Sequence, residues 1–330
     1  MTRQVRLKSL AKVNLDLRVL NRRPDGYHEL RTVFQTISLA DTIDIAYEPA
    51  RRTTLKLDDA LDIPDNLVLR AARSVLDTLK IHATVQFRLR KNIPMGGGLG
   101  GGSSNAAAVL LALPVLAGRP LPFETLAYLG SSLGSDVPFF LTGGTALAID
   151  RGTELYGLPD LKPECILLIA SGIHVATPAA YSALNRANGL TSLDLSRKMN
   201  GFQAFVRALG ELRSAGAASA AGSNDFEPVV FDQHPQLKKM WSGLRKYAAG
   251  ARMTGSGSAL FAVFGSKQER DAARKSLERE RVFRDCRVIP AGTISGRRYR
   301  HLWRAQLAQH LAPETAATKD SWPPRSRYAR

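Results

Sequence analysis

The chain has 330 residues, of which 44% are hydrophobic and 23% are charged, and its formal net charge is +17. This length and composition suit a globular protein with two domains and exclude a disordered or fibrous chain. The two cysteines exclude a disulfide scaffold and a cysteine-based zinc site, and we expect a cytoplasmic protein because no apolar run is long enough for a membrane span or resembles a signal peptide.

The first half of the chain mixes extended and helical patterns. Residues 10–20 alternate apolar and polar side chains, which predicts a strand with one buried and one solvated face. Further extended stretches are expected at 27–45, 84–90 and 145–150. Helices are expected at 66–80, 105–117 and 122–133. A glycine-rich segment therefore lies between a strand and a helix.

The second half shows a similar mixture of apolar strands and amphipathic helices. Strands are predicted at 165–170, 259–264 and 287–289, and helices at 178–185, 235–247 and 267–281. Glycine and proline recur near 150–160, so we place domains at 1–155 and 156–296. Residues 213–222 are rich in Ala, Gly and Ser and predict a flexible loop.

The C-terminal extension, residues 297–330, carries eight Lys or Arg and two acidic residues. Its basic composition and its adjacent prolines predict weak order. Residues 299–311 have a partial apolar face and could form a helix that docks on the second domain or on another chain, while 312–330 stay mobile. We expect no residue of this extension in the active site.

Six glycines occur between residues 96 and 102, interrupted by Leu99 alone. Glycine has no Cβ, so its backbone N–H groups can approach an anion closely, and the helix start adds unpaired N–H groups and a positive dipole end. Ser103 and Ser104 can cap this helix or contact a phosphate. The segment therefore predicts phosphate binding; a flexible linker is the plainer alternative.

Other interpretations of these motifs are weaker. A Walker loop needs lysine where Ser103 stands. The dinucleotide fingerprint G-x-G-x-x-G is met by Gly96, Gly98 and Gly101, but Glu124, near the required acidic position, begins a predicted helix, so a nicotinamide-dependent dehydrogenase is disfavoured but stays open. The net charge suggests a nucleic-acid-binding protein, yet no motif that reads RNA or DNA is present.

Three further positions have both structural and functional interpretations. Asp136 precedes Pro138 and could cap a helix, or it could accept or orient a hydroxyl proton. Lys12 could be a solvated strand residue or a cation that neutralises a transferring phosphate. Residues 254–258 (TGSGS) could form a simple turn or allow close backbone approach.

Three elements in this order resemble the GHMP kinases (galactokinase, homoserine, mevalonate and phosphomevalonate kinases). They are Ala11-Lys12-Val13-Asn14-Leu15, the segment 94–104 and Gly255-Ser256-Gly257. The resemblance covers residues 7–296. It implies an α+β, two-domain GHMP kinase fold, with a ribosomal-S5-like ATP-binding domain, a ferredoxin-like α/β domain and an active site in the cleft between them.

Two further motifs narrow the resemblance within this family. Residues 23–28 (RPDGYH) and 134–138 (GSDVP) are similar to members that phosphorylate a cytidine-diphosphate-linked methylerythritol. This implies an ATP-dependent kinase acting on the 2-hydroxyl of that acceptor, in the non-mevalonate route to isoprenoid precursors. A GHMP kinase with another acceptor stays the alternative.

The resemblance also implies the residues that do this work. Lys12 and Asp136 match the catalytic pair. The ATP-phosphate loop comprises Pro94, Met95, Gly96, Gly97, Gly98, Leu99, Gly100, Gly101, Gly102, Ser103 and Ser104. The acceptor site comprises Asn14, Tyr27, His28, Thr177, Pro178 and Tyr181, with Tyr27 stacking on the cytosine and His28 hydrogen-bonding its edge. Mg²⁺ is expected with ATP, without a dedicated protein carboxylate. ATP and the small-molecule acceptor are the expected partners, with no nucleic acid or membrane, and the protein is expected to be a monomer or a weak homodimer.

Overall fold

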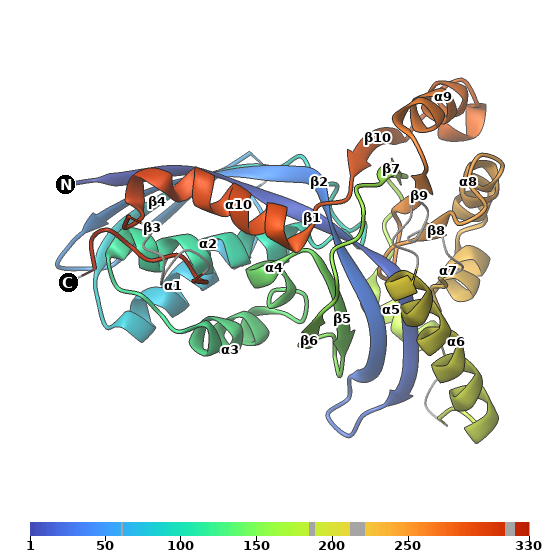
Figure 1. Ribbon diagram of the computed structural model, residues 1–330, viewed down its shortest axis with the longest axis horizontal. Helices are drawn as coiled ribbons and strands as arrows, with labels where there is room; N and C mark the ends of the chain where they lie inside the picture. Colours follow the sequence, from blue (N-terminus) through green and yellow to red (C-terminus); the bar gives the residue numbers. More distant parts are fainter. Residues whose placement is uncertain (61, 185–188, 212–221, 314–320, 330) are drawn as a thin grey trace.

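The computed structural model describes residues 1–60, 62–184, 189–211, 222–313 and 321–329. They form two lobes, each built around one β-sheet (Figure 1). Except for Gly222, the predicted flexible loop at 213–222 lies outside the described residues.

The first sheet is built on a long antiparallel hairpin of β1 (Arg3–Arg22) and β2 (His28–Pro49). Its other strands are β3 (Thr54–Asp59), β4 (Ala83–Arg90), β5 (Thr145–Ile149) and β6 (Glu154–Gly157). They lie in the order β3-β4-β2-β5-β6, and β1 pairs with β2. The hairpin extends from the first lobe to a position beside α5 and α6 of the second (Figure 1).

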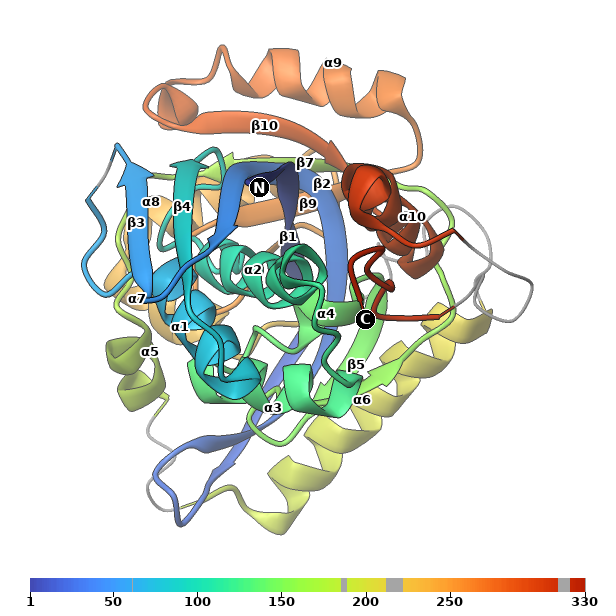
Figure 2. The ribbon, with the colours of Figure 1, turned by 90° about the vertical axis from the view of Figure 1, so that its left-hand side faces the viewer.

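Four helices belong to the first lobe: α1 (Leu67–Leu79), α2 (Gly101–Ala117), α3 (Phe123–Leu133) and the short α4 (Phe139–Thr142). They gather on one side of the sheet, as Figure 2 shows. Residues 104–116 of α2 are all buried, as expected for a helix that is apolar on every side. The glycine-rich segment at its N-terminus is therefore fixed to the core of the lobe.

The second sheet has the order β10-β7-β9-β8, with every pairing antiparallel. Its strands are β7 (Cys165–Ala170), β8 (Arg252–Met253), β9 (Leu260–Phe264) and β10 (Arg287–Gly292). Helices α5 (Thr177–Ala183), α6 (Ser192–Glu211), α7 (Glu227–Gln233) and α8 (Pro235–Arg245) come between β7 and β8, and α9 (Lys267–Leu277) comes between β9 and β10. This is the order of a ferredoxin-like sheet, as the resemblance implied.

The middle of β1 is buried on both faces. Val13 and Leu15 pack in one apolar cluster with Ile166 and Phe261 of the second sheet. Lys12, Asn14 and Asp16, which alternate with them, are also buried. The prediction of one solvated strand face is therefore wrong here, because Asp136 of the first lobe and Ser223 and Thr254 of the second contact the polar side chains.

The C-terminal extension returns to the first lobe. Helix α10 (Gly296–Leu307) places Tyr299, Trp303 and Leu307 in the core of that lobe. The three residues recur every four positions and so form one apolar stripe. Residues 321–329 also lie against the first lobe, where the Ser326 hydroxyl donates to the Val115 carbonyl over 2.7 Å. In its described residues the extension is therefore ordered and docks on the first lobe, not on the second as expected. Residues 314–320 and 330 of the segment expected to be mobile lie outside the described residues.

Candidate active site

A cavity of about 770 Å³ opens between the two lobes, next to the hairpin. Both lobes contribute to its wall. The sequence-predicted residues that line it are Lys12, Asn14, Tyr27, His28, Gly98, Asp136, Thr177, Pro178 and Tyr181. The fold therefore brings the expected catalytic pair, one glycine of the phosphate loop and the expected acceptor site into one space.

Lys12 and Asp136 form an ion pair at the inner end of this cavity. Their Nζ and Oδ2 atoms lie 3.3 Å apart, and the side chains are 3% and 32% exposed respectively. Lys12 Nζ also donates to Asn14 Oδ1 over 2.8 Å and lies 5.0 Å from the centre of the Phe34 ring. Helix α4 starts after Pro138 and has no side-chain cap, so the carboxylate of Asp136 does not serve as a helix cap.

Asn14 links the hairpin to the loop at 254–257. Its Oδ1 accepts from Lys12 Nζ and, over 3.0 Å, from the Gly255 N–H, and its Nδ2 donates to Thr32 Oγ1 over 2.8 Å. Thr254 Oγ1 lies 3.2 Å from the same Asn14 oxygen. Most of the hydrogen-bonding capacity of this side chain is therefore used within the protein, where it orients Lys12, and little is left for the expected acceptor contact.

The carbonyl groups of the glycine-rich loop turn toward the protein. Gly97 O accepts from Ala259 N over 3.3 Å, Gly98 O from Thr254 Oγ1 over 3.3 Å, and Leu99 O from Lys12 N over 3.1 Å. In a trans peptide, the next N–H points opposite to the carbonyl. The N–H groups that follow these three carbonyls are therefore directed away from the protein groups that hold the loop.

The glycines of this loop differ in the space that a Cβ would have. A Cβ at Gly98 would lie 2.2 Å from the Thr254 carbonyl oxygen, and φ is +72° there. A Cβ at Gly100, where φ is +69°, would lie 2.8 Å from the Phe140 ring. A Cβ at Gly102 would lie 3.8 Å from Leu67 Cδ1, an ordinary contact, so packing within the protein does not explain glycine there.

The two serines after the loop also differ. Ser104 is buried, and its hydroxyl donates to the Leu10 carbonyl over 2.7 Å. Its hydroxyl therefore ties α2 to β1. Ser103 is partly exposed in the first turn of α2, where the helix N–H groups are unpaired. Of the two hydroxyls, that of Ser103 is the one open to a phosphate.

Aromatic rings form the outer part of the cavity. The His28 and Tyr181 rings are stacked, with centroids 5.0 Å apart, and Phe226 meets Tyr181 edge-on at 4.8 Å. Burial, together with the nearby charge of Asp136, raises the pKa of Tyr181 to about 12, so this side chain stays neutral at working pH. Tyr27 is 54% exposed, and it therefore offers an open ring face to a ligand.

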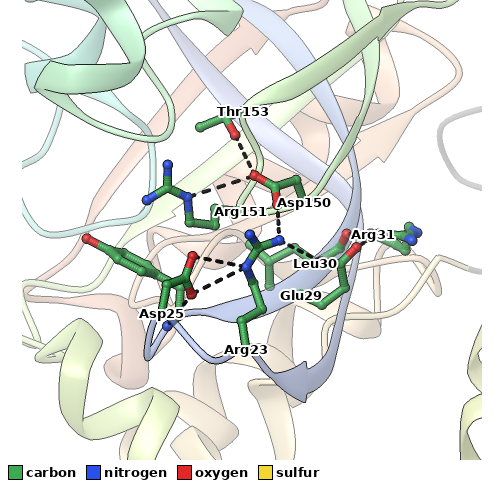
Figure 3. A network of polar contacts seen from close by, with 9 residues as sticks. Arg23, Asp25, Glu29, Leu30, Arg31, Asp150, Arg151 and Thr153 are labelled. Carbon is green, nitrogen blue, oxygen red and sulfur yellow. Dashed lines mark hydrogen bonds and ion pairs between the residues drawn. The ribbon is translucent and has the colours of Figure 1, made fainter.

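The turn that carries Tyr27 is held by the polar network shown in Figure 3. Tyr27 O accepts from Arg23 N over 2.7 Å, and Tyr27 N donates to Asp25 Oδ1 over 3.1 Å. The Arg23 guanidinium pairs with Asp25 at 3.2 Å, with Glu29 at 3.1 Å and with Asp150. Partial burial alone would raise the pKa of Asp150, but hydrogen bonds from Arg151 N–H and Thr153 and the charge of Arg23 lower it. The turn is therefore ordered before any ligand binds.

The loop at 254–257 also forms part of the wall, which a simple turn need not do. Gly255 and Ser256 line the cavity, and Ser256 Oγ is 2.8 Å from Thr177 Oγ1 at the start of α5. Asn224 Nδ2 donates to the carbonyl of Gly255 over 2.8 Å and so helps to fix this loop. Helix α5 and this loop thus close one side of the cavity together.

Sequence reasoning missed several lining residues. Arg22 and Arg151 add positive charge to the cavity, and the Arg151 guanidinium lies 4.8 Å above the Tyr27 ring. Phe226 supports Tyr181. These residues lie in no motif, and only the fold shows that they meet. The positive charge of Arg22 and Arg151 suits a ligand with several phosphate groups.

The described part of the chain lacks two kinds of feature. No three His, Cys, Asp or Glu side chains in it are grouped so that they could hold a metal ion. None of its helices has the length and apolarity that a membrane span requires.

Comparisons with known proteins agree with this geometry. The family models described as GHMP kinases N terminal domain and GHMP kinases C terminal match residues 66–144 and 202–282. A relative from Solibacter usitatus named 4-diphosphocytidyl-2-C-methyl-D-erythritol kinase is 48% identical over 330 residues, covering 99% of this chain and 98% of its own. A relative of the same name from Ralstonia pickettii is 38% identical, covering 82% and 89%.

Solved structures show the same relationship. A 4-(cytidine 5'-diphospho)-2C-methyl-D-erythritol kinase superposes with a TM-score of 0.71 at 34% identity, covering 87% of this chain and 98% of its own. A homoserine kinase from Cytophaga hutchinsonii superposes with a TM-score of 0.67 at 17% identity, covering 88% and 95%, and at that identity it supports the fold alone.

Proposed function

Since this chain belongs to the GHMP kinases, in the group of 4-diphosphocytidyl-2-C-methyl-D-erythritol kinases, we propose that it transfers the γ-phosphoryl group of ATP to the 2-hydroxyl of 4-diphosphocytidyl-2-C-methyl-D-erythritol. The products are ADP and the 2-phosphate, an intermediate of the non-mevalonate route to isoprenoid precursors. The observation that carries the proposal is one cavity in which the Lys12–Asp136 ion pair and Gly98 of the phosphate loop share a wall with the His28–Tyr181 stack.

Asp136 and Lys12 act on the transferring group. Phosphoryl transfer depends on positioning and on charge stabilisation more than on covalent chemistry with the protein. The Asp136 carboxylate accepts or orients the proton of the acceptor hydroxyl. Lys12 offsets the charge on the phosphoryl oxygens, and its pairing with Asp136 favours the ionised carboxylate.

The glycine-rich loop and the start of α2 hold the phosphates of ATP. The N–H groups after Gly97, Gly98 and Leu99 point away from the protein, and the positive end of the α2 dipole favours an anion. Mg²⁺ bound to ATP takes oxygen ligands, mostly from phosphates and water, and would neutralise phosphate charge. The partly exposed Ser103 hydroxyl would be the protein oxygen suited to it, because the Asp136 carboxylate is paired with Lys12 and serves the acceptor hydroxyl.

The outer part of the cavity holds the cytosine. The exposed ring of Tyr27 stacks on the base, and the His28 ring, fixed by its stacking on Tyr181, hydrogen-bonds the base edge. Thr177 and Pro178 close the pocket from α5. Every group invoked belongs to one chain, which agrees with a monomer or weak homodimer. We also propose a cytoplasmic location, with no nucleic-acid or membrane partner.

Asp136→Asn tests the proposal directly. The substitution keeps the side-chain shape, removes the charge and disturbs no helix cap. We expect kcat to fall by about 10²–10⁴ in a protein that remains folded by circular dichroism, with a lower melting temperature because the buried Lys12 loses its counterion. Near-normal kcat in a folded Asp136→Asn protein would contradict the assigned role.

A further inference from the structure

Two side chains of the C-terminal extension hold the end of α4, the helix that begins three residues after Asp136. The Tyr299 hydroxyl donates to the Phe140 carbonyl over 2.5 Å. Trp322 Nε1 donates to the Leu141 carbonyl over 2.8 Å. A helix of four residues cannot satisfy its own last carbonyls, so these two bonds from outside replace the missing helical partners.

The contact between α10 and α4 leaves little freedom. Tyr299 is buried, and a Cβ at Gly143, which ends α4, would lie 2.4 Å from the Tyr299 ring. The start of α10 is fixed as well, because Asp160 Oδ1 accepts from Gly296 N over 2.5 Å. The Tyr299 hydroxyl is therefore held at a set position relative to the end of α4.

Helix α4 in turn contacts both the turn that carries Asp136 and the glycine-rich loop. Phe140 N donates to Val137 O and Leu141 N donates to Pro138 O, both over 3.1 Å, so the turn that carries Asp136 continues into the helix. The Phe140 ring packs against Gly100 of the phosphate loop, where a Cβ would lie 2.8 Å from it. A shift of α4 would therefore move Asp136 and the support of the phosphate loop together.

We propose that Tyr299 and Trp322 are positioning residues for the phosphoryl transfer. They do not line the cavity but act through α4, holding the Asp136 carboxylate at Lys12 and beside the phosphate loop. This inference rests on the proposed function. It gives the C-terminal extension a part in turnover while keeping the expectation that none of its residues lies in the active site.

Tyr299→Phe is the primary variant, because it keeps the ring against Gly143 and removes only the hydroxyl. We expect kcat to fall three- to tenfold, with KM for ATP and for the acceptor within twofold, and Trp322→Phe should act in the same direction. Ser326→Ala is the matched control, since it removes a comparable bond from the extension, to Val115 of α2 and not to α4. It should lower the melting temperature but leave kcat within twofold.

A double-mutant cycle separates positioning from general stability. If Tyr299 acts through Asp136, Tyr299→Phe has little further effect on the residual single-turnover rate of Asp136→Asn. Unchanged kcat in Tyr299→Phe, the same rate factor in both backgrounds, or an equal kcat loss in Ser326→Ala would each overturn the inference. Near-normal kcat in Asp136→Asn would overturn both the proposed catalytic role and this inference. A large loss of kcat in Asp136→Asn together with an unchanged kcat in Tyr299→Phe would overturn this inference alone.

Discussion

Gly98→Ala should destabilise the protein by about 2–5 kcal/mol and remove most of its activity. The added methyl group would lie 2.2 Å from the carbonyl oxygen of Thr254 and 2.9 Å from its carbon, and φ at this position is +72°. A left-handed conformation costs alanine about 1–2 kcal/mol, and overpacking a buried contact typically costs about 1–3 kcal/mol. Because we propose that this loop holds the phosphates, the backbone shift that relieves the contact should also weaken ATP binding.

Gly102→Ala, on the same loop, is the control for stability, because its added methyl group meets no close contact. Its Cβ would lie 3.8 Å from Leu67 Cδ1, an ordinary contact, and alanine in the first turn of α2 gains up to about 1 kcal/mol in helix propensity. Its melting temperature should therefore hold or rise. Because a methyl group there would obstruct a phosphate on the helix start, KM for ATP should rise about tenfold, equivalent to about 1.4 kcal/mol.

Thermal denaturation and initial rates at varied ATP measure both effects. An unchanged melting temperature in Gly98→Ala would refute the packing argument. An unchanged KM for ATP in Gly102→Ala would refute the placement of the phosphates on this loop.

Three further predictions address other parts of the molecule. Tyr27→Ala should raise KM for the acceptor with little change in kcat, since base stacking contributes about 1–3 kcal/mol; Tyr128→Ala, on the exposed face of α3, is the control, and equal effects would contradict the pocket. Trp303→Ala should cost about 3–5 kcal/mol in urea denaturation because this side chain is buried in the first lobe, and a loss below about 1 kcal/mol would contradict its docking there. Burial raises the pKa of Glu227 to about 7, so the folded state retains a proton that the unfolded chain releases near pH 4.5. The free energy of unfolding should therefore fall by about 3 kcal/mol as pH rises from 4.5 to 7, and Glu227→Gln should remove most of that slope; an unchanged slope would contradict the assignment.

Local pattern was sufficient for strands β1, β2, β4, β5, β7, β9 and β10, for helices α1, α2, α3, α5, α8 and α9, and for the order strand, glycine loop, helix. It missed β3, β6, β8, α6 and α7. It failed where distant segments decide the environment. Alternation along residues 10–20 predicted a solvated polar face, yet Lys12, Asn14 and Asp16 are buried. Asn14 and Asp16 bond to Thr254 and Ser223 of the second lobe, whereas Lys12 is paired within the first. The partners that make Lys12 buried and paired come from β2 and from the loop before α4, and no local pattern shows them.

The extension illustrates the same limit. Its apolar stripe was visible in the sequence, but the surface that receives Tyr299 is the glycine at 143, and complementarity between two distant segments leaves no periodic signal. At the acceptor site, the motif resemblance placed His28 and Tyr181 correctly in the cavity. It did not show that they stack on each other, with Phe226 behind, so that Tyr27 presents the exposed ring.

Product analysis with a small panel of acceptors tests the central claim most directly. The purified protein is incubated with ATP and Mg²⁺ and with equal concentrations of cytidine- and uridine-diphosphate-linked methylerythritol, homoserine or mevalonate, and the phosphorylated products are followed by ³¹P NMR. We predict one new phosphomonoester, on the 2-hydroxyl of the cytidine-linked compound, formed in equal amount with ADP. Preferential phosphorylation of homoserine or mevalonate, or equal turnover of the uridine-linked compound, would contradict the account.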